Sequence, residues 1–529
     1  RRSRNSDVCL APVAMGVIPC VMSGFLLTNP SPDGPVPGRR RRLDPDPRFL
    51  PDTSGQLDPL LGCPALIVPS TDLAWRVREW MEELDTSELE STYSSLGRRG
   101  VAPKFMLGAL VLGTLNGLTH ATEIERACAT DARYRLVAGG ASPSATRLRT
   151  FRRDLGEFLA GALKWTVERA VKLGLVEPHA IAVDSWRLRA DASRDSRETR
   201  TKSASRLDAL AKVDPSSLEG EARARHEREV ARHEAVVRRS KVEGRDSFSS
   251  TTPSAGWMKF PDGATGFGHR VNVSATGASK RIVLDVMITP LNNDYGTLEE
   301  LATGTLETLR AAGLPMDDDG PAITVSADAG YASERDLEFA DRSRATIDVL
   351  LPKWDSGAPK KKKGGRYFSH EDFQIGESGV TCPDGRAMRG PYRKSRDGRV
   401  EWRGVGCGSC PKKTDCTAAS KRTISLRPQL IKVRDAMSAR MTEPGAKKLL
   451  RLRAAIIEPV FSSVQDVMKF RRASSRHEPT IRAEILLRLL AHNLQRLQAA
   501  APIAVWPVVL VTRERRLVGV EICARHDAS

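Results

Sequence analysis

Two aspartates each end a short apolar run that has the composition of a buried strand. Asp184 closes the run at residues 179–183, and Asp328 closes the run at 322–327. A carboxylate in this position lies at the edge of a sheet, where ligand sites form. Two such carboxylates on neighbouring strands can hold hard divalent cations, and a metal pair there would serve phosphodiester chemistry. The alternative is that each aspartate only caps a turn or a helix.

A third carboxylate, Glu458, lies among apolar residues in the helical pattern at 453–461. Burying a carboxylate is costly unless it is paired or bound to a metal ion. Two structural alternatives are an ion pair with Arg453 and a first-turn position just before Pro459. The local sequence favours the metal-binding role and the structural roles equally.

Four of the nine cysteines fall late in the chain with the spacing C-x24-C-x2-C-x5-C. Four thiolates can form a closed tetrahedral Zn²⁺ site, and a closed site is structural rather than catalytic. The alternative is four buried thiols. Nine cysteines in 529 residues do not make a disulfide scaffold. The predicted zinc ligands are Cys382, Cys407, Cys410 and Cys416.

The chain carries a formal charge of +18, which favours a polyanionic partner such as DNA. Aromatic residues make up only 5%, so a large stacking platform for single strands is excluded. Basic residues gather at the start of a predicted helix at 146–153, at 360–363, and after Glu458. The alternatives are solvated helix faces and a general excess of arginine. The candidate DNA contacts are Arg147, Arg149, Arg152, Arg153, Lys469, Arg471 and Arg472.

The elements that must position these residues follow from hydrophobic periodicity. Helical patterns fill the first part of the chain, and strand-type runs alternating with helices follow. The fold class is therefore mixed α+β, with an all-α N-terminal unit, a mixed sheet flanked by helices and a small zinc-ribbon-like insertion. The expected parts are a disordered basic, proline-rich arm (1–64), a helical DNA-binding domain (65–178), the sheet core (179–355) with a helical insertion (195–245), a basic loop and Cys-rich module (356–425), C-terminal helices carrying the third acid (426–500), and a tail with one possible hairpin (501–529).

The first residues resemble a targeting signal, with Arg1 and Arg2 before a fairly apolar stretch. We interpret residues 1–27 as sequence upstream of the true start, with a signal peptide as the alternative. No other segment is expected to span a bilayer.

Three segments together resemble the acidic motifs of DDE insertion-sequence transposases, most closely the insertion-sequence 1182 type. They are residues 182–194, 327–331 and 453–461. Residues 482–494 resemble that group's closing helix, and 100–106 with 122–126 resemble its N-terminal part. The resemblance runs in order over about residues 70–500, and this collinearity makes it specific.

The resemblance implies an RNase H-like core in which Asp184, Asp328 and Glu458 bind two Mg²⁺ or Mn²⁺ ions. Such enzymes cut DNA at the element ends and join the freed 3′-OH to target DNA, usually as a dimer on paired ends. Arg453 matches a basic residue near the scissile phosphate. Tyr331 would contact DNA or stack on a displaced base, with a packed aromatic as the alternative. The family also implies a cytoplasmic protein associated with the nucleoid.

The chain departs from the family pattern at four positions. Ser185 and Trp186 follow the first acid where Gly-Thr is usual, Ser462 stands where Gly is usual, and Gln465 occupies the position of a lysine. A missing cation weakens electrostatic stabilisation at the phosphate. These departures favour an alternative, a decayed or adopted transposase that only binds DNA. A further alternative is a zinc-ribbon scaffold or regulator, in which the two aspartates would lie on unrelated surfaces.

Overall fold

The computed structural model describes residues 46–316, 320–352, 367–369, 372–376, 379–393, 399–500, 509–511 and 517–519. The apolar stretch near the N-terminus, most of the expected arm and the basic run at 360–363 lie outside these residues. Within the described ranges, no helix is both long and apolar enough to cross a membrane.

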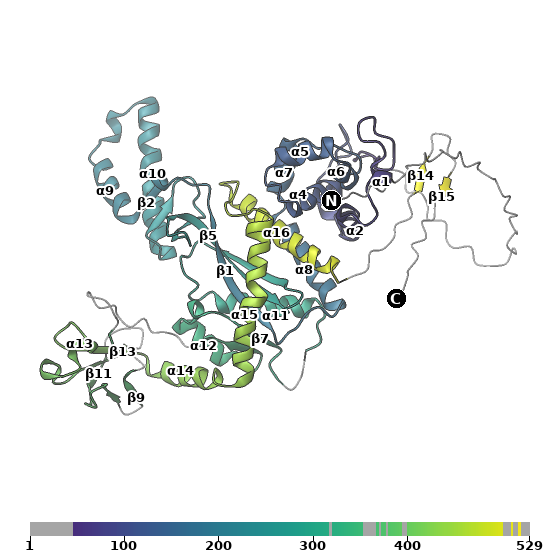
Figure 1. Cartoon of the computed structure of the whole chain (residues 1–529). Helices are drawn as coiled ribbons and strands as arrows, with labels where there is room; N and C mark the ends of the chain where they lie inside the picture. The colour runs from purple at the N-terminus through teal and green to yellow at the C-terminus, as the bar shows by residue number, and fades with distance from the viewer. Residues whose placement is uncertain are drawn as a thin grey trace, which may run out of the picture. The chain divides into compact units, whose positions relative to one another are not determined.

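Eight helices in the described chain precede the first strand of the main sheet, as the helical periodicity predicted (Figure 1). The centre of this unit is α4, in which almost every side chain is buried. Phe49 is only 6% exposed and packs in the same core, so ordered packing begins before the expected boundary at residue 64. The helices are α1 (Pro64–Ile67), α2 (Leu73–Glu83), α3 (Ser87–Ser91), α4 (Pro103–Leu115), α5 (Ala121–Thr130), α6 (Ala132–Val137), α7 (Ala145–Arg153) and α8 (Gly156–Lys172).

The main sheet is mixed, and its strand order is β4-β5-β1-β7-β8, with β6 also paired to β5. β5 is antiparallel to β1, β4 and β6, whereas β7 is parallel to both β1 and β8. This arrangement, with a helical unit before it, is compatible with an RNase H-like core. The strands are β1 (Ile181–Arg189), β4 (Gly256–Lys259), β5 (Thr265–Thr276), β6 (Ile282–Thr289), β7 (Ile323–Ser326) and β8 (Ile347–Leu350).

Alternating side chains of β1 enter two different cores because successive strand residues point to opposite faces. Ala182 and Trp186 pack on one face with residues of α15 (Pro444–Ser462) and α16 (Glu478–Gln498). Ile181 and Val183 pack on the other face with α11 (Leu298–Ala311) and α12 (Glu334–Arg342). Figure 1 shows α15 running beside β1. Helices from the C-terminal part of the chain therefore complete the core that the first strands begin.

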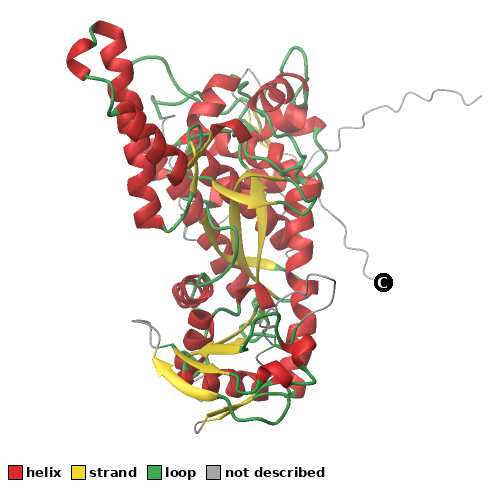
Figure 2. Ribbon diagram, turned by 90° about the vertical axis from the view of Figure 1, so that its left-hand side faces the viewer, coloured by secondary structure: helices red, strands yellow, loops and turns green. Residues whose placement is uncertain are grey.

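A helical hairpin interrupts the chain between β1 and β4. It consists of α9 (Arg200–Leu210) and α10 (Gly220–Glu243), with the break at Pro215. Figure 2 shows the two helices side by side, and short strands β2 (Arg197–Thr199) and β3 (Ser247–Ser249) pair at their base.

The Cys-rich segment forms small sheets of its own around Trp402 and Ile424. After it, α14 (Pro428–Arg440) leads into α15. In the tail, β14 (Val509–Val511) pairs with β15 (Leu517–Gly519), the hairpin indicated by the sequence. The elements of the Cys-rich segment are β9 (Gln374–Gly376), β10 (Gly379–Thr381), β11 (Arg389–Arg393), β12 (Val400–Arg403), α13 (Lys413–Cys416) and β13 (Thr423–Leu426).

Candidate active site

The two predicted strand-terminal aspartates lie on neighbouring strands. β1 and β7 are parallel, and Ala182 pairs with Ser326. Asp184 and Asp328 each come two residues later, so they lie side by side. Asp328 follows the end of β7, but β1 continues to Arg189, so the prediction that Asp184 ends its strand is wrong. The alternative in which the two acids lie on unrelated surfaces therefore does not describe this chain.

Asp184 lies in a partly buried and strongly polar environment. Its Oδ2 accepts a hydrogen bond from Arg453 Nη1 at 2.5 Å, and its Oδ1 accepts one from the backbone N–H of Ser185 at 2.7 Å. Burial raises the pKa of Asp184, the Ser185 N–H and Arg453 oppose that rise, and the nearby Asp328 charge adds to it. A cation beside the pair would offset the cost of burying the charged carboxylates and the repulsion between them.

Asp328 also caps a turn, as the structural alternative anticipated. Its Oδ1 accepts from the backbone N–H of Gly330 at 2.8 Å, which starts the short turn at Ala329–Tyr331. The cap uses only Oδ1 of Asp328, and Oδ2 does not take part in it. Capping the turn and binding a cation are therefore compatible.

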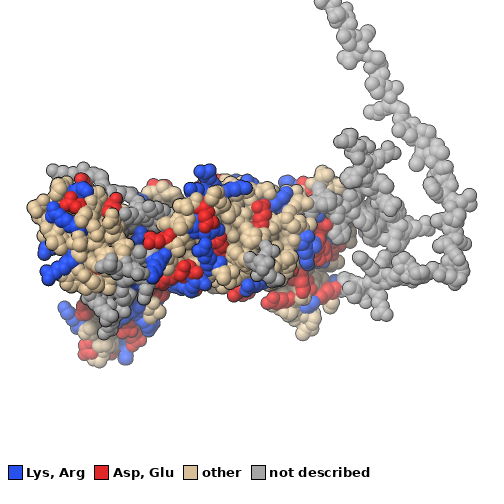
Figure 3. All heavy atoms as spheres, turned by 90° about the horizontal axis from the view of Figure 1, so that it is seen from below, with Lys and Arg blue, Asp and Glu red and all other residues tan. Residues whose placement is uncertain are grey.

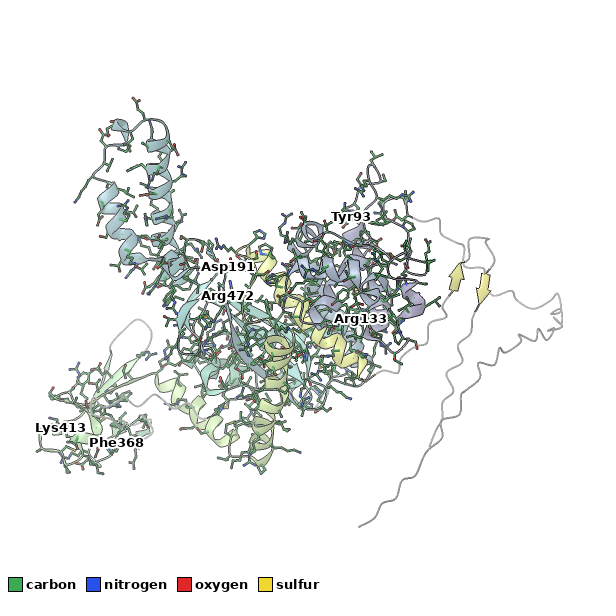
Figure 4. The ribbon with its side chains drawn as sticks, turned by 45° about the horizontal axis from the view of Figure 1, so that its top comes forward. Tyr93, Arg133, Asp191, Phe368, Lys413 and Arg472 are labelled. Atoms are coloured by element: carbon green, nitrogen blue, oxygen red, sulfur yellow. The ribbon has the colours of Figure 1, made fainter. Side chains whose placement is uncertain are left out.

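A cavity of about 540 Å³ opens beside the two aspartates. Asp184 and Asp328 line it together with Arg187, Arg189 and Arg471. Arg471 reaches the cavity because the chain after α15 runs beside the end of β1, where Arg189 N–H donates to the Arg471 carbonyl at 3.3 Å. In Figure 4, Asp191 just beyond β1 and Arg472 mark this junction. The cavity thus combines carboxylates with cations that could bind phosphate.

Glu458 is on the expected helix but is not part of the cavity wall. Two other residues of α15 reach the site: Arg453 bonds to Asp184, and the Phe461 ring lies 5.3 Å from the Trp186 ring. The Glu458 side chain itself is exposed. Across the described residues, no three His, Cys, Asp or Glu side chains are grouped closely enough to hold a metal ion. The structure therefore brings two of the three predicted acids together and places the helix of the third beside them.

Arg270 and Asp294 are among the cavity residues that the sequence analysis missed. Asp294, in the loop after β6, accepts from Ser185 Oγ at 2.7 Å and from Arg270 Nη1 at 2.5 Å. In the sequence, Asp294 lies in a segment typical of a turn, because Asn and Asp are common turn formers, so it did not stand out as a site residue. The available signal was Arg270, because an arginine inside an apolar strand pattern requires a buried partner.

Tyr331 does not fit the predicted contact with DNA. Its side chain is fully buried, and its hydroxyl donates to Asn272 Oδ1 at 2.9 Å. Burial, with the Asp294, Asp184 and Asp328 charges nearby, raises the pKa of the phenol well above its usual value. The packed aromatic, the structural alternative, is what the structure shows.

The predicted basic contacts divide into exposed and buried residues. Arg147, Arg149 and Arg153 are exposed on α7, and Arg153 pairs with Asp154. Arg152 is only 8% exposed and forms an ion pair with Glu484 of α16 at 3.2 Å, so its predicted role in DNA contact is wrong. The cause is helical periodicity, because Arg152 lies one turn from the buried Leu148.

After Glu458, a turn of π-helix at Ser463–Val467 ends the helix, and the basic segment follows it. Lys469 and Arg472 are exposed, and Lys469 has a left-handed φ of 52°. Lys469 packs near Gly117 rather than at the cavity. Gln465, at the position of the family's lysine, and Arg471 do line the cavity. Arg471 is therefore the cation beside Gln465, although it is also paired with Asp466.

A second groove, of about 490 Å³, lies in the N-terminal helical unit between residues 89–101 and α7. Arg98 and Arg147 line it from opposite segments, together with Tyr93, which is labelled in Figure 4. In the part of the chain that is described, neither arginine has a carboxylate partner. In contrast, Figure 3 shows basic and acidic residues intermingled over one face, so net charge alone does not locate a binding surface.

The four late cysteines converge on one small pocket of about 20 Å³. Burial raises the pKa of Cys416, and the other three thiols add to that rise, whereas Arg422 opposes it. Phe368 and Lys413, labelled in Figure 4, also line the pocket. Convergence of the four thiols is thus observed, but the described thiols are not close enough together to make a recognisable metal site.

Two family models match separate parts of the chain. Residues 66–154 match a transposase domain (DUF772), and residues 381–498 match a transposase DDE domain. The second match includes Arg453 and Glu458, whereas Asp184 and Asp328 lie between the two matches. No curated protein and no solved structure matches the chain. The two matches support a DDE transposase and do not resolve its insertion-sequence type.

Proposed function

We propose that this chain is a transposase of the insertion-sequence 1182 type, which cuts DNA at its element's ends and joins the freed 3′ ends to target DNA. The observation that carries the proposal is the hydrogen bond from Arg453 to Asp184. It links the segment that matches a transposase DDE domain to the strand-borne aspartates outside that match. The test is divalent-cation-dependent nicking of a duplex that carries the element's terminal sequence.

The donor set suits Mg²⁺ or Mn²⁺, because Asp184 and Asp328 offer hard carboxylate oxygens at one cavity. These two residues would hold the cations, with Glu458 as third ligand after its exposed side chain turns toward them. Bound cations would activate the attacking oxygen and stabilise the leaving one.

Basic residues at and beside this cavity would position the DNA. Arg453, which donates to Asp184 without being part of the cavity wall, would offset negative charge beside the scissile phosphate. Arg187 and Arg471 line the cavity beside the two aspartates, so they would bind phosphates of the DNA and fix its register.

The second candidate function is a DNA-binding protein without nuclease activity. The exposed position of Glu458 and the Gln465 substitution favour it. A chain that binds terminal DNA but does not nick it with Mg²⁺ or Mn²⁺ would establish this alternative. In either case we place the protein in the cytoplasm on nucleoid DNA, with two copies on paired ends.

We assign binding of the terminal DNA to the groove of the N-terminal unit. Replacing Arg98 and Arg147 with alanine should weaken duplex binding and lower the slope of log K against log salt by about 2, or roughly 0.9 per lost phosphate contact. Fluorescence anisotropy at several salt concentrations measures both quantities. The matched control is Arg310→Ala with Arg344→Ala, two exposed arginines outside the groove. Equal slopes for the two double variants would contradict the assignment.

We also propose that the four late cysteines bind one structural Zn²⁺. Cys407→Ser with Cys410→Ser should remove at least about nine-tenths of the zinc from the purified protein, because a closed site needs all four thiolates. Elemental analysis of the purified chain measures the zinc content. Cys128→Ala is the control, since Cys128 is buried in the N-terminal core away from this pocket. Zinc that is absent from the unaltered chain, or unaffected by the paired serines, would refute the proposal.

A further inference from the structure

We infer that Arg270 and Asp294, acting through Ser185, are positioning residues that hold Asp184 and Asp328 in register for cation binding. The inference rests on the proposed function, because it concerns the same cavity. It adds two residues that no motif assigns and gives a role to the serine that departs from the family pattern.

Arg270 is the centre of the network. It lies in β5, is only 3% exposed and lines the cavity. Its guanidinium donates to Asp294 Oδ2 at 2.5 Å and to Ser185 Oγ at 2.8 Å. It also donates to the backbone carbonyl oxygens of Leu291 and Asn292. One side chain therefore ties the loop after β6 to the middle of β1.

Ser185 carries this connection to the first acid. Its hydroxyl accepts from Arg270 and donates to Asp294 Oδ1 at 2.7 Å. Its backbone N–H donates to Asp184 Oδ1 at 2.7 Å. A glycine here would keep the N–H but lose the hydroxyl, which both accepts and donates. Serine at this position is therefore the link between the buried ion pair and Asp184.

Asp294 also lies next to the turn that holds the second acid. A Cβ atom placed on Gly330 would lie 2.9 Å from Asp328 Oδ1 and 3.6 Å from Asp294 Oδ2. The two carboxylates therefore flank the same glycine. The Arg270 and Asp294 side chains are 3% and 12% exposed, against 19% and 21% for Arg453 and Asp184, so Asp294 is less accessible to a cation and we assign it an orienting role.

The physical consequence is pre-organisation. Two carboxylates that repel each other would move apart unless their strands and turns are held by other bonds. A hydrogen-bonded and largely buried ion pair resists that motion, since each broken bond leaves a polar group unsatisfied. Loss of a residue that hydrogen-bonds to a metal ligand typically lowers metal affinity about 10–100-fold.

The experiment measures Mn²⁺ binding to the full chain by electron paramagnetic resonance, without DNA. Ser185→Ala should weaken Mn²⁺ binding by about tenfold, whereas Ser185→Thr, which keeps the hydroxyl, should stay near the unaltered chain. Arg270→Gln with Asp294→Asn, which removes both charges together, should weaken binding at least as much as Ser185→Ala.

The matched control is Arg440→Gln with Asp348→Asn. These residues form another partly buried ion pair, between α14 and β8, and they do not line the cavity. If the cavity variants bind Mn²⁺ as this control does, the network is merely structural and the inference fails. Asp184→Asn distinguishes a failure of this inference from a failure of the proposed function. If Asp184→Asn also leaves Mn²⁺ binding unchanged, or if the unaltered chain binds no Mn²⁺, the proposed cation site itself is wrong.

Discussion

Asp184→Asn is expected to lower the rate of cation-dependent DNA nicking by about 10³-fold, which corresponds to ~4 kcal/mol of transition-state stabilisation. The amide keeps the size of the carboxylate and can still accept from Arg453, but it is a poor ligand for a hard cation. Burial raises the pKa of Asp184 and so already disfavours its charged form. Loss of the charge should therefore cost little folding free energy, and the effect should appear in rate rather than in stability.

A matched control is Asp285→Asn in β6. Asp285 is also a partly buried aspartate of the main sheet, and burial raises its pKa to about 6. It does not line the cavity, so nicking should remain within about twofold of the unaltered chain. Single-turnover nicking of terminal DNA, with thermal unfolding measured in parallel, compares the two variants. Nicking that survives Asp184→Asn would refute the enzyme function and favour the DNA-binding alternative.

Glu484→Gln is expected to destabilise the fold by about 3–5 kcal/mol, the usual loss when one member of a buried ion pair is removed. Glu484 is fully buried on α16, pairs with Arg152 of α7, and accepts from the Ser474 backbone N–H at 3.0 Å. Arg488 is buried nearby, and burial lowers its pKa to about 10, with Glu484 opposing that shift and Arg152 adding to it. Without Glu484, Arg152 and Arg488 would lie in the core with no carboxylate partner among the residues that the structure describes.

Urea unfolding measures this loss, with Glu227→Gln as the control. Glu227 pairs with Arg223 four residues earlier on α10, and both side chains are exposed, so its loss should cost at most about 0.5 kcal/mol. Because Arg152 and Glu484 belong to widely separated parts of the chain, Glu484→Gln should also loosen the N-terminal helices from the core. Similar midpoints for the two variants would show that the buried pair contributes no special stability.

The N-terminal helices, the principal strands and the positions of Asp184 and Asp328 could all be predicted from local sequence. Apolar runs and their period are properties of neighbouring residues along the chain, so helices and strands can be predicted from them without the tertiary fold. The proximity of Cys407, Cys410 and Cys416 could be anticipated because at most five residues separate successive members, whereas 24 residues separate Cys382 from Cys407 and only the fold brings it to the others. The packing of Phe49 into the N-terminal core could not be predicted. Its proline-rich segment has no hydrophobic period, and the surface that covers Phe49 comes from other parts of the chain.

The local sequence was enough to predict a mixed fold, an acid after the strand that precedes Asp328, a third acid on a later helix and a strongly basic chain, but it placed the end of β1 too early, at Asp184. The set of charged groups that face the cavity emerges only from the folded chain. Folding buried Arg152 and Tyr331, left Glu458 exposed, and brought Arg270 and Asp294 to the acids. The physical reason is that the burial of a charged or polar group depends on its partners, and those partners come from strands and helices far away along the chain.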